Sequence, residues 1–260
     1  MICEEVIKYL DECSPSHFAY EWDNVGLLVG RRDREVKRIM VALDASSEVI
    51  ERAVQNRVDM IVTHHPLIFK GMKRVTPDDF IQRRVFDLIQ NDIAYYAMHT
   101  NFDVMGMADA VADALEIENR QVLDVSYEDS ISIEGCGRYG DLSRTYSLGE
   151  YAKTVKQQLK LDNVIVYGEL DSLVETVAVL PGSGADFIDQ VIKVGADVYV
   201  TGDIKYHQAI DALEQGLTLI DAGHYGSEKI FIPYMMSYLE RKLPQLEIHA
   251  YKREAEIHVI

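Results

Sequence analysis

The stretch Val62-Thr63-His64-His65-Pro66 decides the fold, and it follows the apolar residues 60 and 61. An apolar run that stops at two imidazoles and a proline indicates a buried strand that ends in a polar turn. Open α/β sheets bind their ligands at the carboxyl ends of their strands. The stretch therefore predicts an α/β protein with a functional site at the end of this strand.

The residues on either side of this stretch alternate between apolar runs and amphipathic segments. Residues 39–43 form a predicted strand, and Ser46 or Ser47 is the predicted cap of the helix that follows. Together with the strand over residues 60–63, they make a βαβ unit. The other elements predicted in this half are helices over 2–12, 78–90 and 104–118, a short strand within 22–30, and a strand over 93–98.

The pattern of the first half returns after residue 175. Three apolar runs of the second half, 177–179, 197–201 and 217–221, resemble the runs 41–43, 59–63 and 93–97 of the first half. The last run of each set leads to a histidine, His99 in the first half and His224 in the second. We interpret the pattern as an internal duplication of an α/β unit. Equivalent strand ends from two copies can then form one site between them.

The middle and the end of the chain complete the set of predicted elements. Those of the middle are strands over 131–139 and 164–168 and a helix over 149–160. A helix is predicted over 227–242, capped by Ser227 and kinked by Pro233, because proline interrupts helical hydrogen bonding. A last strand is predicted over 245–251.

The composition narrows the class of protein. The 260 residues carry a formal net charge of −17, which disfavours nucleic acid as a partner because phosphate backbones are repelled. Three cysteines without zinc-ribbon spacing indicate no thiolate metal site, so any metal must be held by nitrogen and oxygen. No apolar run is long enough to span a membrane, and the first ten residues carry charges where a signal peptide is apolar. We expect a cytoplasmic enzyme without a membrane partner.

Five polar residues lie at or just after the ends of predicted strands: His64, His65, Asp103, His224 and Glu228. Imidazoles and carboxylates suit a borderline divalent ion such as zinc, manganese, iron, cobalt or nickel. Adjacent histidines on an extended strand would point to opposite faces, so this pair must sit in a turn or serve different ions. A structural role for the pair is the alternative that spacing alone leaves open.

One assignment uses every member of this set. His64 and Asp103 bind one ion, His65 and His224 bind the other, and Glu228 bridges the two. In bridged two-metal hydrolases the ions lie about 3.5–4 Å apart, and a shared water becomes the nucleophile. The assignment therefore predicts two divalent ions as cofactors and a metal-bound water, rather than a side chain, as the nucleophile.

Other polar residues near the predicted strand ends are weaker candidates. His99 and Asn101 are expected to orient the ligands, because such groups fix the tautomer of a ligating imidazole. Asp44, Asp203 and His207 are candidates for the wall of a pocket, although helix capping explains them equally well.

Four motifs together resemble the NIF3-like family, whose members are also called type 2 GTP cyclohydrolase 1 homologues. The motifs are Trp22-Asp23-Asn24-Val25-Gly26-Leu27, Thr63-His64-His65-Pro66-Leu67, His99-Thr100-Asn101-Phe102-Asp103 and Gly223-His224-Tyr225-Gly226-Ser227-Glu228. The resemblance implies two intertwined α/β domains related by duplication. The first would span 1–104 plus 226–260 and the second 105–225, without a mid-chain insertion domain. It also implies a dinuclear metal site with the same five ligands.

The resemblance carries further expectations about assembly and activity. Members commonly form ring-shaped, toroidal homohexamers, which are trimers of dimers. Activity on GTP, which opens the imidazole ring with loss of formate, is attributed to some of them. We therefore expect a metal-dependent hydrolase that acts on a nucleotide or a related heterocycle, although no P-loop of the type Gly-x-x-x-x-Gly-Lys-Ser/Thr occurs. The alternative is a non-catalytic protein for metal storage or delivery, or a scaffold.

Overall fold

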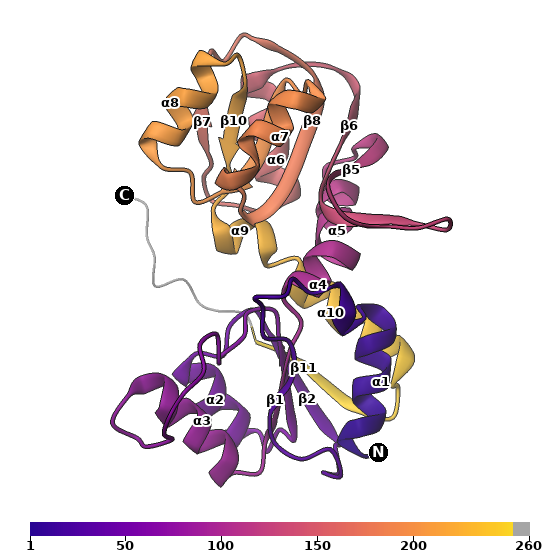
Figure 1. The fold of residues 1–260 in the computed structure, drawn as a ribbon, viewed down its shortest axis with the longest axis vertical. Helices are drawn as coiled ribbons and strands as arrows, with labels where there is room; N and C mark the ends of the chain where they lie inside the picture. The colour runs from indigo at the N-terminus through magenta and orange to yellow at the C-terminus, as the bar shows by residue number, and fades with distance from the viewer. Residues whose placement is uncertain (252–260) are drawn as a thin grey trace. The chain divides into compact units, whose positions relative to one another are not determined.

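The structure, a computed structural model, describes residues 1–251 and forms two compact α/β units (Figure 1). The first unit contains Met1–Phe102 and the segment that begins at Phe231, and the second contains Asp103–Ile230. Each unit has its own sheet with helices on both faces, which confirms the predicted α/β class. Residues 252–260 of the predicted first domain lie outside the described residues.

The first unit is built on a five-stranded sheet with the order β1-β4-β3-β2-β11. Its strands are β1 (Gly26–Val29), β2 (Arg38–Ala42), β3 (Met60–Thr63), β4 (Ala94–Ala97) and β11 (Glu247–Ala250). All pairs are parallel except β1 with β4. Strands β3 and β4 are buried along their whole length, as expected for parallel strands covered on both faces. The carboxyl ends of β2, β3 and β4 therefore meet at one edge of the sheet.

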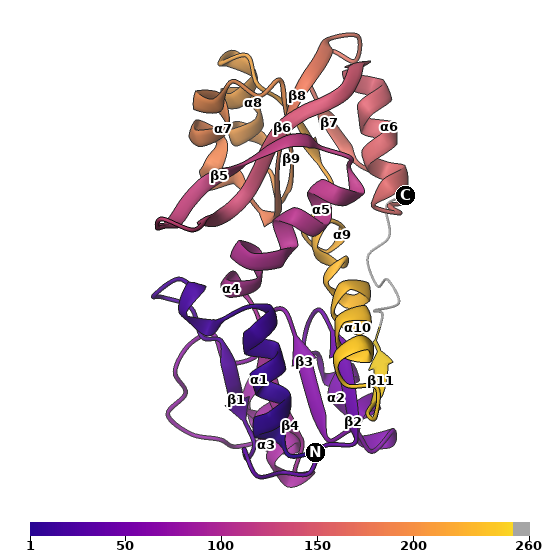
Figure 2. The same ribbon diagram turned by 90° about the vertical axis from the view of Figure 1, so that its right-hand side faces the viewer.

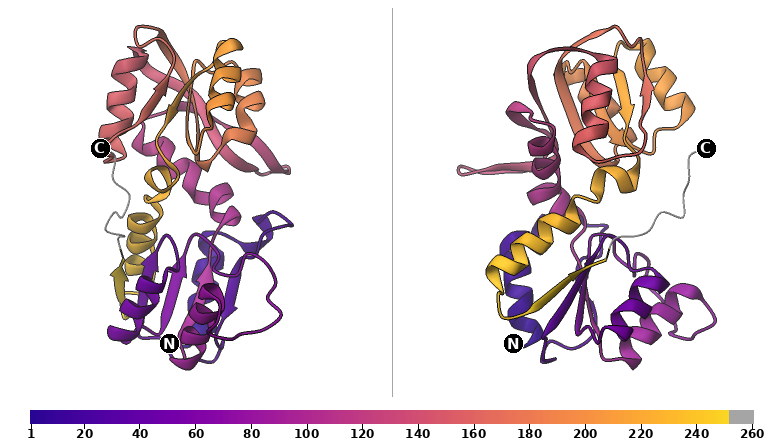
Figure 3. Two further views of the ribbon diagram at one scale, coloured as in Figure 1. Left: turned by 90° about the vertical axis from the view of Figure 1, so that its left-hand side faces the viewer. Right: turned by 180° about the vertical axis from the view of Figure 1, so that it is seen from behind.

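Helices cover both faces of this sheet. They are α1 (Cys3–Cys13), α2 (Ser47–Gln55), α3 (Phe80–Gln90), the single turn α4 (Thr100–Phe102) and α10 (Phe231–Lys242). Helices α2 and α3 lie on one face, and α1 and α10 lie on the other (Figure 3). The side chain of Ser46 caps α2 by accepting a hydrogen bond from the amide of Val49 at 3.2 Å, as predicted.

The second unit is built on a six-stranded sheet with the order β5-β6-β8-β9-β10-β7. Its strands are β5 (Glu118–Glu128), β6 (Ile133–Ser147), β7 (Ile165–Tyr167), β8 (Leu173–Ser183), β9 (Val198–Gly202) and β10 (Thr218–Asp221). Its helical segments are a π-helical turn over Asp103–Met107, α5 (Ala108–Ala114), α6 (Leu148–Gln158), a 3₁₀ turn over Ala185–Phe187, α7 (Ile188–Val194), α8 (Tyr206–Glu214) and α9 (His224–Glu228). Helices α5 and α6 lie on one face of the sheet, and α7 and α8 lie on the other (Figure 2).

An aspartate of each unit has the same role, which is consistent with the predicted duplication. Oδ2 of Asp59, just before β3, accepts hydrogen bonds from the amides of Lys37 and Arg38 at 2.8 and 3.0 Å. Oδ2 of Asp197, just before β9, accepts hydrogen bonds from the amides of Glu175 and Thr176, both at 2.9 Å. Each carboxylate thus fastens the start of one parallel strand to its neighbour.

Two sequence predictions are wrong in detail. The predicted helix over 227–242 is two helices, α9 and α10, and Ser227 lies inside α9 instead of capping it. Pro233 sits in the first turn of α10, where no helical partner for its nitrogen is needed, so it kinks nothing. The middle of the chain forms a long hairpin of β5 and β6 in place of one strand over 131–139.

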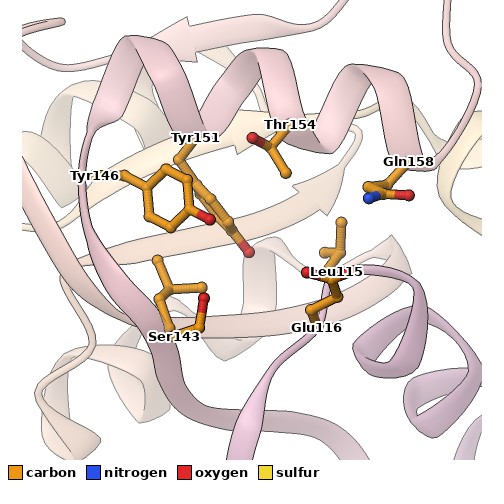
Figure 4. A pocket seen from close by; sticks show the side chains of 8 residues that line it. Leu115, Glu116, Ser143, Tyr146, Tyr151, Thr154 and Gln158 are labelled. Carbon is orange, nitrogen blue, oxygen red and sulfur yellow. The ribbon is translucent and has the colours of Figure 1, made fainter.

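A small cavity of about 10 Å³ lies beside α6 in the second unit (Figure 4). Its lining includes Tyr146 and Tyr151, whose ring centroids are 5.7 Å apart. A space of this size has room for about one water molecule. It is too small for a metabolite and is not a candidate site.

No helix among the described residues is both long and apolar enough to cross a membrane.

Candidate metal centre

His64 and His65 lie in a bend directly after β3, at the carboxyl edge of the first sheet. Their ring centroids are 4.9 Å apart, with an angle of 47° between the ring planes. The buried hydroxyl of Tyr95 holds the bend, because it donates to the carbonyl of His65 at 2.7 Å and accepts from the amide of Leu67 at 2.8 Å. The turn therefore brings two adjacent imidazoles together, as one of the two sequence alternatives requires.

Both imidazoles are fixed through Nδ1. Nδ1 of His64 lies 2.8 Å from the carbonyl oxygen of Met98, and Nδ1 of His65 lies 2.8 Å from Oδ1 of Asp44. An oxygen acceptor at Nδ1 assigns the proton to that nitrogen and the lone pair to Nε2. A partner of this kind behind a ligating imidazole is the usual arrangement in protein metal sites.

His99, after β4, completes a cluster of three imidazoles within the first unit. Its ring centroid lies 5.2 Å from that of His64 and 5.7 Å from that of His65. The three residues offer nitrogen atoms within 4.8 Å of one another. His99 is therefore placed beside both predicted ligands of this unit.

Asp23, which was not among the predicted site residues, holds His99. Its Oδ1 lies 2.9 Å from Nδ1 of His99, and its Oδ2 accepts from the amide and hydroxyl of Thr100 at 3.0 and 2.6 Å. Burial of this carboxyl group, which is fully shielded from solvent, raises its pKa, but the hydrogen bonds from His99 and Thr100 outweigh that effect and lower the pKa to about 2. Asp23 is thus a buried carboxylate that orients an imidazole.

His224 plays the corresponding part in the second unit. It begins α9 just after β10, and its Nδ1 lies 2.8 Å from Oδ2 of Asp203, which follows β9. The chain separation of 21 residues in this pair equals that between Asp44 and His65. Nε2 of His224 lies 3.1 Å from Oε2 of Glu228, one helical turn later.

Glu228 is buried, with 5% of its side chain exposed, against a glycine of β8. A β-carbon on Gly182 would collide with Oε1 of Glu228 and would lie 3.7 Å from Nε2 of His224. The amide of Gly182 also donates to the hydroxyl of Ser227 at 2.9 Å. The carboxylates of Glu228 and Asp103, the first residue of the π-helical turn, offer oxygen atoms within 4.8 Å of each other.

The remaining candidates lie apart from these contacts. The buried Asn101 donates through Nδ2 to the carbonyl oxygen of Ser14 at 2.8 Å, which ties α4 to the end of α1. His207 is exposed at the start of α8, with its ring 5.3 Å from that of Tyr206. Asp44 and Asp203, by contrast, contact imidazoles directly.

The donor atoms fit a divalent metal ion. Two atoms bonded to one ion at about 2.0–2.1 Å lie about 3.0–3.4 Å apart, and Nε2 of His224 and Oε2 of Glu228 are separated by 3.1 Å. Each histidine of the candidate centre (His64, His65, His99 and His224) has Nδ1 held by an oxygen and thus presents Nε2. The space left by Gly182 admits the buried carboxylate of Glu228. Each unit therefore carries groups that can hold a metal ion.

Known proteins are similar to this chain in sequence and in fold. The sequence profile of Duf34/NIF3 (NGG1p interacting factor 3) matches residues 1–256. A protein of Clostridium perfringens named GTP cyclohydrolase 1 type 2 homolog is 35% identical, with 88% of this chain and 87% of that protein covered. A Streptococcus pneumoniae protein of the same name is 36% identical, with 93% and 91% covered.

Solved structures agree with these sequence relationships. A Bacillus cereus protein related to NIF3 superposes with a TM-score of 0.93 at 27% identity, with 100% of this chain and 99% of that chain covered. Reduced HcgD from Methanocaldococcus jannaschii superposes with a TM-score of 0.83 at 35% identity, with 96% and 97% covered. The chain therefore belongs to the Duf34/NIF3 family, as its four motifs predicted.

Proposed function

We propose that this protein binds two divalent metal ions and uses them to hydrolyse a nucleotide or a related heterocycle. In this proposal His64 and Asp103 hold one ion, His65 and His224 hold the other, and Glu228 bridges them. The observation that carries the proposal is the oxygen partner at Nδ1 of each histidine, because it leaves Nε2 available as a ligand.

The chemistry of the donor set supports a hydrolytic role. Neutral imidazoles and carboxylates without thiolates suit zinc, manganese, iron, cobalt or nickel. Two such ions would supply a nucleophile at neutral pH and would neutralise charge that develops on the substrate. The nucleotide in the proposal is supported by the name of the relatives, GTP cyclohydrolase 1 type 2 homolog.

The residues behind the ligands have a defined part in this proposal. Asp44 and Asp203 keep the proton on Nδ1 of His65 and His224, which holds each ring in one tautomer and one orientation. The carbonyl of Met98 does the same for the fully buried His64. The chain thus holds the three imidazoles in fixed orientations before the two proposed ions bind.

The test measures metal content and turnover on the same preparations. Purified protein is loaded in turn with each of the five metals, its metal content is determined, and formate release from GTP is followed. Two ions per chain with formate release support the proposal in its specific form. Bound metal without formate from GTP, and without hydrolysis of any nucleotide in a panel, would reject the hydrolase and favour metal storage or delivery.

The ring-shaped hexamer belongs to the same proposal. Light scattering on the metal-loaded protein should give a mass about six times the 29.5 kDa of one chain. A monomeric mass at all protein concentrations would reject the hexamer, and it would not contradict the proposed metal ligands.

A further inference from the structure

Two large aromatic side chains of the first unit face solvent beside the imidazole cluster. Trp22, the only tryptophan of the chain, is 60% exposed, and Phe69 is 52% exposed. Their ring centroids are 5.9 Å apart and their planes are tilted by 56°. Tyr20 also stacks with Trp22, with 5.8 Å between the ring centroids. These rings gain little of the free energy that burial would give, and adjoining exposed aromatic side chains are typical of a binding surface.

Hydrogen bonds hold both loops that carry these rings. Next to Trp22, the buried Asp23 is fixed by His99 and Thr100, and the amide of Tyr20 donates to the hydroxyl of Thr100 at 3.0 Å. Nδ2 of Asn24 donates at 2.6 Å to the carbonyl of Ile68, the residue before Phe69. The two aromatic rings are therefore presented by anchored backbone.

The rings continue into the imidazole cluster. The indole of Trp22 meets the ring of His99 edge to face at 6.1 Å, and His99 lies 5.2 Å from His64. A molecule that reached these histidines with one group would bring its neighbouring atoms against Trp22.

The loop that follows Phe69 in the chain adds positive charge. Lys70, Lys73 and Arg74 are exposed within six residues of Phe69, in a chain whose net charge is −17. Among residues 1–251, these three cations form no ion pair with a carboxylate. A local cationic loop on an acidic protein attracts an anionic ligand.

We propose that Trp22 and Phe69, the aromatic platform, bind the planar heteroaromatic ring of the substrate, and that the cationic loop of Lys70, Lys73 and Arg74 binds its phosphate. A nucleotide has both groups, and aromatic faces stack on every nucleobase without reading its hydrogen bonds. This proposal rests on the proposed function in one respect, because only the proposed function makes the bound nucleotide a substrate. The binding of the ring itself requires no metal.

The first experiment follows the fluorescence of Trp22. GMP, AMP, CMP, UMP and ribose 5-phosphate are titrated into the protein, once loaded with zinc and once after dialysis against a chelator. Stacking should quench the emission with one or more of the nucleotides and not with ribose 5-phosphate. If none of the four nucleotides binds in either state, the platform is rejected.

The second experiment compares variants by calorimetry with the nucleotide that binds best. Trp22→Ala and Phe69→Ala should each weaken binding about 5- to 150-fold, as the loss of one base stack does. Phe80→Ala removes a phenylalanine of the same unit that is 62% exposed, and it should leave affinity unchanged. Equal affinity for Trp22→Ala and the unchanged protein would overturn the proposal.

Two further measurements keep the result interpretable. If Trp22→Ala does not fold, Trp22→Phe should retain most of the affinity and Trp22→Leu should lose it, and equal binding by both would count against stacking. The double variant Lys70→Gln, Lys73→Gln should bind GMP more weakly and should bind guanosine with unchanged affinity. Metal content separates the two proposals. Variants of the aromatic platform should keep their metal. His65→Ala should lose metal, but nucleotide should still quench its Trp22 fluorescence after treatment with the chelator.

Discussion

Gly182 and Glu228 meet so closely that a β-carbon on the glycine would collide with the carboxylate oxygen Oε1. The glycine also has a backbone φ of +79°, which side chains of L-residues rarely adopt. The position of a buried carboxylate at the candidate centre thus depends on the absence of a side chain on β8.

Replacement of Gly182 by alanine should therefore displace Glu228 and weaken metal binding in the second unit. We expect a loss of about 10- to 100-fold in metal affinity, the range for groups that support a ligand. Gly195→Ala is the matched control, because Gly195 has a similar φ of +74° and open space around it. Both variants should share the backbone strain, so an equal loss of metal in both would contradict the steric explanation.

The aspartates behind two of the imidazoles give a second prediction. Asp44→Asn and Asp203→Asn should each lower metal affinity about 10- to 100-fold, because the amide no longer holds the tautomer and charge of its histidine. Their side chains are 45% and 56% exposed, so stability should change little. Competition with a chromogenic chelator measures the effect. Asp33→Asn, an exposed carboxylate paired with Arg31, is the control and should bind metal normally.

The assignment of the ligands to two ions predicts different stoichiometries for two carboxylate variants. Glu228→Gln should lower the metal content at both positions, since Glu228 is proposed as the bridge. Asp103→Asn should empty mainly one position. Elemental analysis after gel filtration decides between them, and two ions retained by the Glu228→Gln protein would reject the bridging role.

Asp23 gives a prediction about pH. Its carboxyl has a pKa of about 2 in the folded protein, below the ordinary value near 4, so ionised Asp23 stabilises the fold above about pH 4. The shift corresponds to about 2 kcal/mol at pH 7, and this contribution disappears as the pH falls from about 4 towards 2. Asp23→Asn should therefore lower the free energy of unfolding of the metal-free protein at pH 7, and the difference should shrink below pH 4. Urea denaturation at pH 7 and pH 3 measures the free energies of unfolding of both proteins. A difference between them that grows on acidification would contradict the lowered pKa of Asp23.

The strands and the histidines at their ends could be predicted from the sequence, because both leave local patterns. A buried parallel strand is a short apolar run, and β3 and β4 each end where an apolar run meets a histidine. The turn after β3 could be named as an alternative from the adjacency of His64 and His65. The choice of the turn, however, depends on the hydroxyl of Tyr95, which lies about thirty residues away.

Other features depend on contacts that no local pattern records. Asp23 looks like an ordinary turn residue in the sequence, and its role comes from Thr100 and His99, more than seventy residues later. The hydroxyl of Ser227 was expected to cap a helix, but it accepts the amide of Gly182 from β8. Strand β5 was missed although Leu123, Val125 and Tyr127 alternate with polar residues, because its first four residues are polar and Leu123 is its one buried residue.

The order of the two units along the chain has a consequence for biosynthesis. Strand β11 pairs with β2, and helix α10 covers the same sheet, yet both are translated after the whole of the second unit. On a ribosome that adds about 5–20 residues per second, the second unit has its complete sequence available before the first does. The nascent chain must keep the unpaired edge of β2 from other strands until residue 250 emerges. The inserted half is thus expected to be the first to fold, and the half that begins the chain is the last to close.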